Sequence, residues 1–101
     1  MSVKDKKLSA VQAEIARERA ESLSRSAGRL RRALEALRHF DGGTLAGQSR
    51  SQLLHEASEA CLAYVVQREV MGFGMQDVNG VRKDFEVPQD VWNGMGALRS
   101  A

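Results

Sequence analysis

The sequence is poor in the residues from which disulfides and catalytic sites are built. Its 101 residues include one cysteine, one proline, two histidines and five aromatic residues. The single cysteine, Cys61, excludes an intramolecular disulfide, and its position inside the apolar run Ala60–Val66 indicates a small buried side chain rather than a reactive thiol. The chain also lacks a Gly-x-Ser-x-Gly motif, a Cys-x-x-Cys pair and a phosphate-binding lysine loop. We therefore expect a protein that is not an enzyme and that holds neither a cofactor nor a metal ion.

Long hydrophobic runs are missing too. The longest, Ala60–Val66, has seven residues, against the roughly 20 that a helix needs to cross a bilayer. The first residues hold no apolar signal-peptide segment. We expect a cytoplasmic protein that does not contact a membrane. The length predicts a single domain, and a short, elongated chain buries a modest share of its surface, which favours self-association.

A strong helical period is present instead. Between Leu8 and Phe40, apolar residues recur at close to the helical repeat of about 3.6 residues, which predicts one long helix. Gly42 and Gly43 follow, and glycines at this position are typical of a helix end. Gly28 lies inside the helix, and we interpret it as the mark of a close helix crossing.

A second helix is predicted after a glycine-rich connection. Ser49 and Gln52 have the spacing of a capping box, and Gly72 ends the apolar pattern. A short connection favours an antiparallel pair, and Pro88 suits the first turn of a further helix. The sequence thus predicts an all-α fold, a long antiparallel helical hairpin plus two short C-terminal helices, assembling as a dimeric helical bundle. The predicted segments are a disordered tail over 1–7 and one helical domain over 8–101, with helices at about 8–41, 49–72, 77–85 and 88–95.

The predicted hairpin leaves hydrophobic side chains uncovered. When the second helix is run back along the first from Phe40, it ends near Arg17, so the first helix extends beyond it. Helical spacing also points Val66 and Val70 of the second helix away from its apolar side. Either the apolar C-terminal residues fold back over this surface or a second chain covers it, and we expect a homodimer with an antiparallel four-helix arrangement. The residues assigned to this dimer or C-terminal packing surface are Leu8, Val11, Ile15, Val66, Val70 and Trp92.

Two arginines fall on the apolar sides of the predicted helices. Arg19 lies between Ile15 and Leu23 on the first helix, and Arg68 lies near the middle of the apolar side of the second. A buried guanidinium needs a carboxylate partner, so we expect each arginine to form a buried or interfacial ion pair. The alternatives are an anion-binding site in a groove, or an arginine whose stem covers apolar surface while its head stays in water.

Charge is unevenly distributed along the chain. Residues 23–40 carry five basic groups and one acidic group, whereas residues 41–101 carry five basic and eight acidic groups. The basic zone offers nucleic-acid binding as an alternative function. Helical spacing spreads its arginines over about half of the helix circumference, which favours a solvated face instead. The arginines of this zone are Arg25, Arg29, Arg31, Arg32 and Arg38.

Two further motifs carry less weight. His55 and Glu59 stand one turn apart and can share a metal ion, but they lie on the polar side of their helix, which favours solvated residues. The stretch Val81–Trp92 has the form of a helix-turn-helix. Its second helix offers no arginine or lysine near its start to contact base edges, which counts against DNA binding.

One extended pattern resembles a known family. The segments Ala60–Glu69 and Asp84–Gly96, together with Arg31–Leu37, resemble a family of small bacterial proteins with no assigned function. The resemblance implies a helical chain that occurs without fused domains, and it brings no catalytic or binding residues. The function that the sequence favours is that of a homodimeric protein-interaction or structural module that binds a second copy and another protein.

Overall fold

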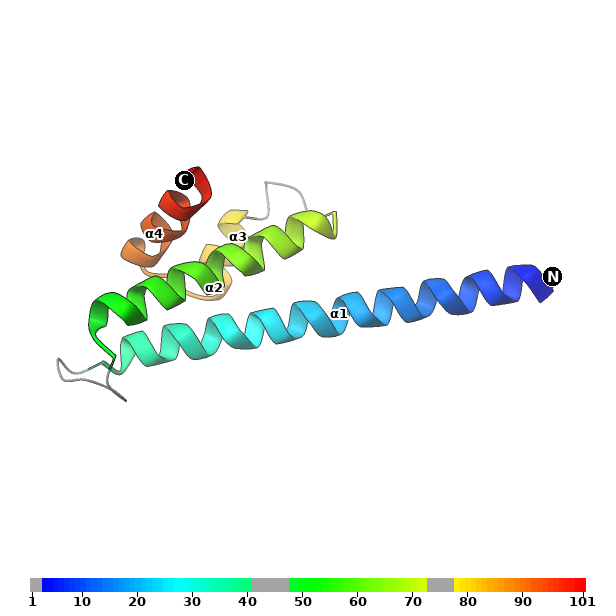
Figure 1. Cartoon of the computed structure of the whole chain (residues 1–101), viewed down its shortest axis with the longest axis horizontal. Coiled ribbons are helices and arrows are strands. Elements are labelled where there is room, and N and C mark those ends of the chain that lie inside the picture. The colour runs from blue at the N-terminus through cyan, green and yellow to red at the C-terminus, as the bar shows by residue number, and fades with distance from the viewer. Residues whose placement is uncertain (1–2, 41–47, 73–77) are drawn as a thin grey trace.

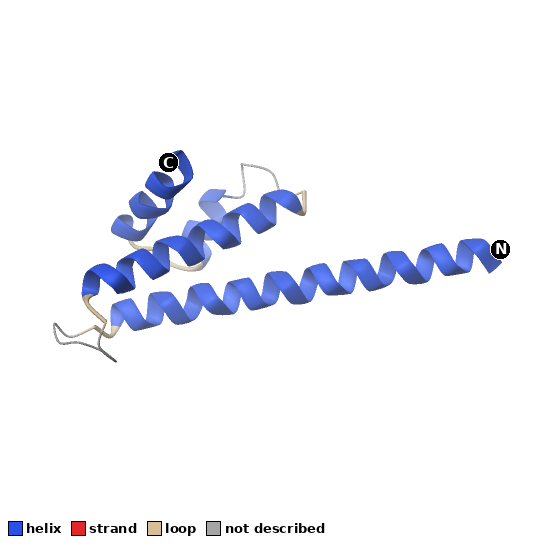
Figure 2. Ribbon diagram, in the orientation of Figure 1, coloured by secondary structure: helices blue, strands red, loops and turns tan. Residues whose placement is uncertain are grey.

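The chain folds into four helices. The computed structural model describes residues 3–40, 48–72 and 78–101, with side chains from Lys6 onward. The helices are α1 (Val3–Arg38), α2 (Arg50–Val70), α3 (Val78–Asp84) and α4 (Gln89–Ser100), and these three segments contain no strand (Figures 1 and 2). The predicted all-α fold, with a long first helix, a second helix and two short C-terminal helices, is confirmed.

The helix α1 starts earlier and ends earlier than the sequence predicts. It begins at Val3 rather than Leu8, because residues 3–7 contain neither glycine nor proline and include lysines, which have high helix propensity. It ends at Arg38, and the Phe40 N–H donates to the Leu37 carbonyl at 3.3 Å, which tightens the last turn. The predicted glycine stop at 42–43 lies outside the described residues, as do residues 1 and 2 of the predicted tail.

The helix α2 begins at the predicted capping box, which is confirmed. The Ser49 N–H donates to Gln52 Oε1 at 2.8 Å, and the Gln52 N–H donates to Ser49 Oγ at 3.2 Å. At the other end, Gly72 has a φ of 94°, a left-handed conformation that glycine adopts without strain. Its N–H donates to the Glu69 carbonyl at 3.0 Å, so the chain leaves the helix here as predicted.

The helix α2 is the centre of the fold. It lies between α1 on one side and α4 on the other (Figure 1). Because α2 is covered twice, its buried residues extend around much of its circumference and meet Leu30 and Leu34 of α1 and Val91 of α4 in one core. The buried residues of α2 are Leu53, Ala57, Ser58, Ala60, Cys61, Tyr64 and Val65.

The helices α2 and α4 approach each other closely at Gly94. A Cβ added to Gly94 would lie 2.3 Å from Ser58 Oγ and 3.1 Å from Ser58 Cβ. The buried Ser58 hydroxyl donates to the Leu54 carbonyl at 2.8 Å, within its own helix. The interpretation of Gly28 as a crossing point is wrong, because a Cβ there would meet the guanidinium of Arg32, which belongs to the same helix. The glycine at a close crossing is Gly94.

A sharp corner separates α3 from α4. The helix α3 ends in a Schellman motif, in which the Val87 N–H donates to the Arg82 carbonyl at 3.0 Å and the Glu86 N–H donates to the Lys83 carbonyl at 3.2 Å. Glu86 accordingly has a φ of 52°, a left-handed conformation in which glycine is the usual residue. The helix α4 continues beyond its predicted end at residue 95 to Ser100, because strong helix formers follow Gly96.

Candidate interaction surface

The N-terminal half of α1 has no cover from the described part of the chain. Gln67, close to the end of α2, donates to Ser22 Oγ, and every side chain from Lys6 to Glu21 is exposed. The sequence predicts that α2 ends near Arg17 of α1, whereas in the structure it ends near Ser22. The uncovered part of α1 is therefore longer than predicted. The helices α3 and α4 lie beside α2 and do not reach this half (Figure 1). Of the two predicted covers, the chain's own C-terminal helices are therefore excluded.

The two faces of the α1–α2 hairpin differ in what covers them. On one face, which we call the C-terminal face, the Phe85 ring centre lies 5.2 Å from the Arg31 guanidinium carbon and 5.0 Å from the Tyr64 ring centre. On the other, which we call the open face, Arg29 Nη2 lies 3.8 Å from Glu59 Oε2. Since a helix turns by about 100° per residue, Arg29 and Arg31 point to opposite sides of α1. The C-terminal segment, by which we mean residues 78–101 with α3 and α4, thus covers only one face of the hairpin.

The large exposed hydrophobic side chains of the described residues all lie on the open face. Ile15 precedes Arg29 by two heptads, and Val66 follows Glu59 by one, so each lies on the side of its helix that bears the ion pair. The other members follow at steps of about one turn. We call this set the apolar row, and it consists of Leu8 (53% exposed), Val11 (56%), Ile15 (42%), Val66 (42%) and Val70 (81%).

Trp92, which the sequence assigns to the same surface, lies elsewhere. It is half-buried on α4, packs against the core, and has the Arg82 guanidinium carbon 5.6 Å from its ring centre. Val91 and Met95, its neighbours on α4, are buried. Trp92 thus belongs to the packing of the C-terminal helices and is not part of the apolar row.

The two arginines singled out in the sequence have different surroundings. Arg19 is exposed on the uncovered half of α1 and makes no ion pair with the described residues. Arg68 is half-buried, with its guanidinium carbon 5.8 Å from the Tyr64 ring centre and its Nη1 donating to Tyr64 Oη at 3.4 Å. The contact places a cation over an aromatic ring. A buried or interfacial ion pair stays a prediction for both arginines.

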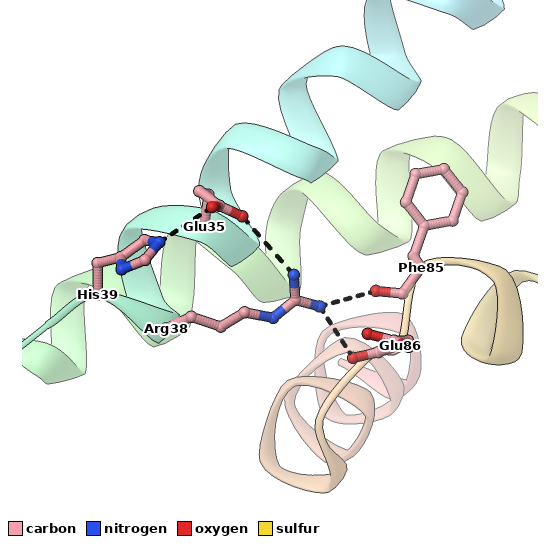
Figure 3. A network of polar contacts seen from close by, with 5 residues as sticks. All are labelled: Glu35, Arg38, His39, Phe85 and Glu86. Carbon is pink, nitrogen blue, oxygen red and sulfur yellow. Dashed lines mark hydrogen bonds and ion pairs between the residues drawn. The ribbon is translucent and has the colours of Figure 1, made fainter.

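Figure 3 shows a polar network in which Arg38 reaches from the last turn of α1 to the corner between α3 and α4. Its Nη2 donates to the carbonyl oxygens of Phe85 at 3.0 Å and Glu86 at 3.2 Å. Glu35 contacts both Arg38 and His39. Its Oε2 lies 3.7 Å from Arg38 Nη1, and its Oε1 lies 3.0 Å from His39 Nε2. Arg38 is therefore a structural residue that fixes the C-terminal segment to α1. Sequence reasoning missed this role, because backbone carbonyl acceptors leave no signal in a residue pattern.

The five arginines assigned to nucleic-acid contact do not form one surface. Arg29 pairs with a glutamate on the open face. Arg31 and Arg38 point to the C-terminal face, where they contact the α3–α4 corner. Arg25 and Arg32 are exposed on α1. The structure thus divides these arginines between two faces, and three of them already have contacts within the chain.

The cysteine and the histidine–glutamate pair have simple surroundings. Cys61 is fully buried, and burial raises the pKa of its thiol to about 11. His55 Nε2 lies 2.7 Å from Glu59 Oε1 across one turn of α2, and both side chains are exposed. Across residues 3–40, 48–72 and 78–101, no group of three or more histidine, cysteine, aspartate or glutamate side chains is arranged to hold a metal ion.

Two ion pairs that sequence reasoning missed tie α4 to α2. Arg50 Nη2 lies 2.7 Å from Asp90 Oδ2, and Arg99 Nη2 lies 2.8 Å from Glu69 Oε2. The hydrogen bond from Arg50 lowers the pKa of Asp90, against the smaller opposing effect of its partial burial. The partners are 40 residues apart in the first pair and 30 in the second, so helical spacing could not have paired them.

Comparison with known proteins identifies a family but no described activity. None of the helices seen in the described segments is long and apolar enough to cross a membrane. No curated protein matches the chain significantly, and neither does any solved structure. The whole chain, residues 1–101, matches a family whose description is "Family of unknown function (DUF6665)". The chain therefore belongs to this family of unknown function, as the resemblance in its sequence implied.

Proposed function

We propose that this protein is a cytoplasmic, homodimeric helical module that acts by binding another macromolecule and has no catalytic activity of its own. The observation that carries the proposal is the apolar row, five large hydrophobic side chains exposed along one face of the hairpin. Exposed hydrophobic surface of this kind marks an interaction site on a soluble protein. The elongated shape, 63 × 29 × 24 Å, gives a second helix room to lie along α1.

A second copy is the proposed occupant of the open face. The row continues along α1 beyond the end of α2, so a partner helix laid there extends the helix pair that the chain already forms. The same segment carries exposed charges of both signs, including Lys7, Glu14 and Glu18. A helix with an apolar strip flanked by mixed charges is well suited to pair with a copy of itself.

The alternative, binding of nucleic acid by the basic half of α1, has weaker support. Arg29, Arg31 and Arg38 are engaged within the chain and point to two different faces. A gel-shift titration with duplex DNA and with RNA at low and moderate salt tests this alternative. Salt-sensitive micromolar binding that is lost in an Arg25→Glu, Arg32→Glu variant would favour it over the proposed module.

The homodimer is tested by native mass from light scattering at micromolar concentration. The wild-type chain of 11.1 kDa should have twice its own mass. Val11→Glu places a charge in the apolar row and should yield the monomer, because a carboxylate in an apolar contact is costly. Ala13→Glu is the matched control, since it adds the same charge on the opposite side of the same helix segment.

The Ala13→Glu control should stay dimeric. A monomeric Val11→Glu variant would then result from the change in the apolar row and not from the added charge in general. Circular dichroism of both variants confirms that each remains a folded helical protein. A monomeric wild-type protein at these concentrations would refute the proposal. Equal masses for Val11→Glu and Ala13→Glu would show that the apolar row is not the contact surface.

A further inference from the structure

We infer that two copies pair antiparallel through their open faces, with the two-fold axis near Ile15 and with Leu8 of each copy against Val66 and Val70 of the other. This inference rests on the proposed homodimer and specifies its geometry. Three observations carry it, namely the distribution of charge along α1, the position of the end of α2, and the placement of the apolar row across both helices.

The charge distribution decides the direction of pairing. Residues 23–40 of α1 carry five arginines and one glutamate. A parallel arrangement in register would place these two strongly basic segments side by side, where like charges repel. An antiparallel arrangement through the N-terminal halves keeps the basic segments at opposite ends of the dimer. Electrostatics therefore favours the antiparallel direction.

The end of α2 sets the length of the row. The contact between Gln67 and Ser22 places Val66 close to the level of Ser22 on α1, and Val70 one turn nearer to Leu8. The row therefore spans the length of α1 from residue 8 to about residue 22, roughly 21 Å at the helical rise of 1.5 Å. Its middle falls at Ile15.

A two-fold axis at the middle of the row gives each of its members an apolar neighbour. Residue 15 then lies opposite residue 15, and residue 8 lies at the level of residue 22 of the second copy, beside Val66 and Val70. The end of α2 in one copy thus meets the start of α1 in the other. If the axis were moved toward the N-terminus, Val66 would lose its neighbour; if it were moved away, Leu8 would.

On one flank of α1, the contact between Lys7 and Glu21 agrees with this alignment. Glu14 lies midway between them and meets Glu14 of the second copy, a like-charge contact that the ion pair of each Glu14 with Arg17 offsets. In an antiparallel helix pair, the same flank of each helix meets. Lys7 and Glu21 are four turns apart on one flank of α1, and both are exposed. With the axis near Ile15, Lys7 lies within about two residues of the level of Glu21 in the second copy, and symmetry forms this opposite-charge contact twice.

Disulfide cross-linking tests the geometry. The variants are Ile15→Cys, Leu8→Cys and Val70→Cys, and each is first weighed by light scattering under reducing conditions to establish that it remains dimeric. The native Cys61 is fully buried, so the wild-type chain is the control that should not cross-link. On oxidation, Ile15→Cys alone should form a covalent dimer. An equimolar mixture of Leu8→Cys and a size-tagged Val70→Cys should form the mixed dimer.

Leu8→Cys alone should not cross-link, because the two copies of residue 8 lie about 20 Å apart along the helices, and a disulfide needs its Cα atoms within about 7 Å. Ready cross-linking of Leu8→Cys to itself would overturn the antiparallel geometry in favour of a parallel dimer. A dimeric mass with no disulfide from Ile15→Cys or from the mixture would overturn the inference and leave the homodimer standing. A monomeric mass for the wild-type chain would overturn both.

Discussion

Two glycines of α4 allow the packing of the C-terminal helices to be tested, because alanine at one should lower the free energy of unfolding and alanine at the other should raise it. A Cβ at Gly94 would lie 2.3 Å from Ser58 Oγ, about 1 Å short of the 3.4 Å at which ordinary contact begins. Overpacking of this kind costs about 1–3 kcal/mol, and the better helix propensity of alanine returns about 1 kcal/mol. Gly94→Ala should therefore lower the free energy of unfolding by up to about 2 kcal/mol. Gly96→Ala, two residues on, meets no atom within 4 Å and should raise it by up to about 1 kcal/mol.

Thermal unfolding followed by circular dichroism measures both effects. In a domain of this size, 1 kcal/mol shifts the thermal midpoint by about 4–8 °C, so the two variants should separate clearly. Protein concentration is held fixed, because the midpoint of the proposed dimer would depend on it. The Ser58→Ala background removes the oxygen that the new Cβ would meet, so Gly94→Ala should cost less there by at least about 0.5 kcal/mol. Equal stabilisation by Gly94→Ala and Gly96→Ala would refute the close approach of α2 and α4.

Three further predictions follow from single sites. Glu86→Gly should raise the free energy of unfolding by up to about 1 kcal/mol in a denaturant titration, because glycine holds the left-handed φ of 52° without strain, whereas Glu86→Ala should show no such gain. Cys61 should resist a thiol reagent at pH 8 in the folded protein and react at once in denaturant, since its pKa is raised to about 11; fast reaction of the native protein would contradict its burial. The pKa of Asp90 is lowered by Arg50, so the pair stabilises the fold above the ordinary aspartate pKa and this stability is lost as the pH falls through the lowered one. Asp90→Asn should thus cost at most about 1 kcal/mol at pH 7 and progressively less as the pH falls below the ordinary aspartate pKa, and a cost that does not change with pH would rule out an electrostatic origin.

Much of the helical framework could be predicted because local rules determine it. The capping box at Ser49 and the stop at Gly72 depend on residues a few positions apart, and both were located from the sequence. Helical spacing also identified Leu8, Val11, Ile15, Val66 and Val70, which are the large hydrophobic side chains exposed in the described chain.

The rest depends on which face of the hairpin receives the C-terminal segment, and local rules do not decide this. The sequence assigned Trp92 to the dimer or C-terminal packing surface next to the start of the first helix, but its helix packs on α2 and turns it toward the core. Arg38 was assigned to a basic zone, although its acceptors are two backbone carbonyls 47 and 48 residues away. Gly28 and Gly94 look alike in sequence, and only the positions of neighbouring helices show which of them permits a close contact.

The uncovered half of α1 has a consequence for folding. Residues 27–38 are held by packing against α2, whereas every side chain of residues 6–21 is exposed in the described structure. In a lone chain the N-terminal half is therefore helical only by propagation from the packed half, which avoids the cost of nucleation but leaves each turn marginally stable in water. Its amide hydrogens should exchange quickly in a monomer and slowly in the proposed dimer. In the proposed dimer, ordering of this half contributes to the free energy of association, so helix formation and pairing would be one coupled step.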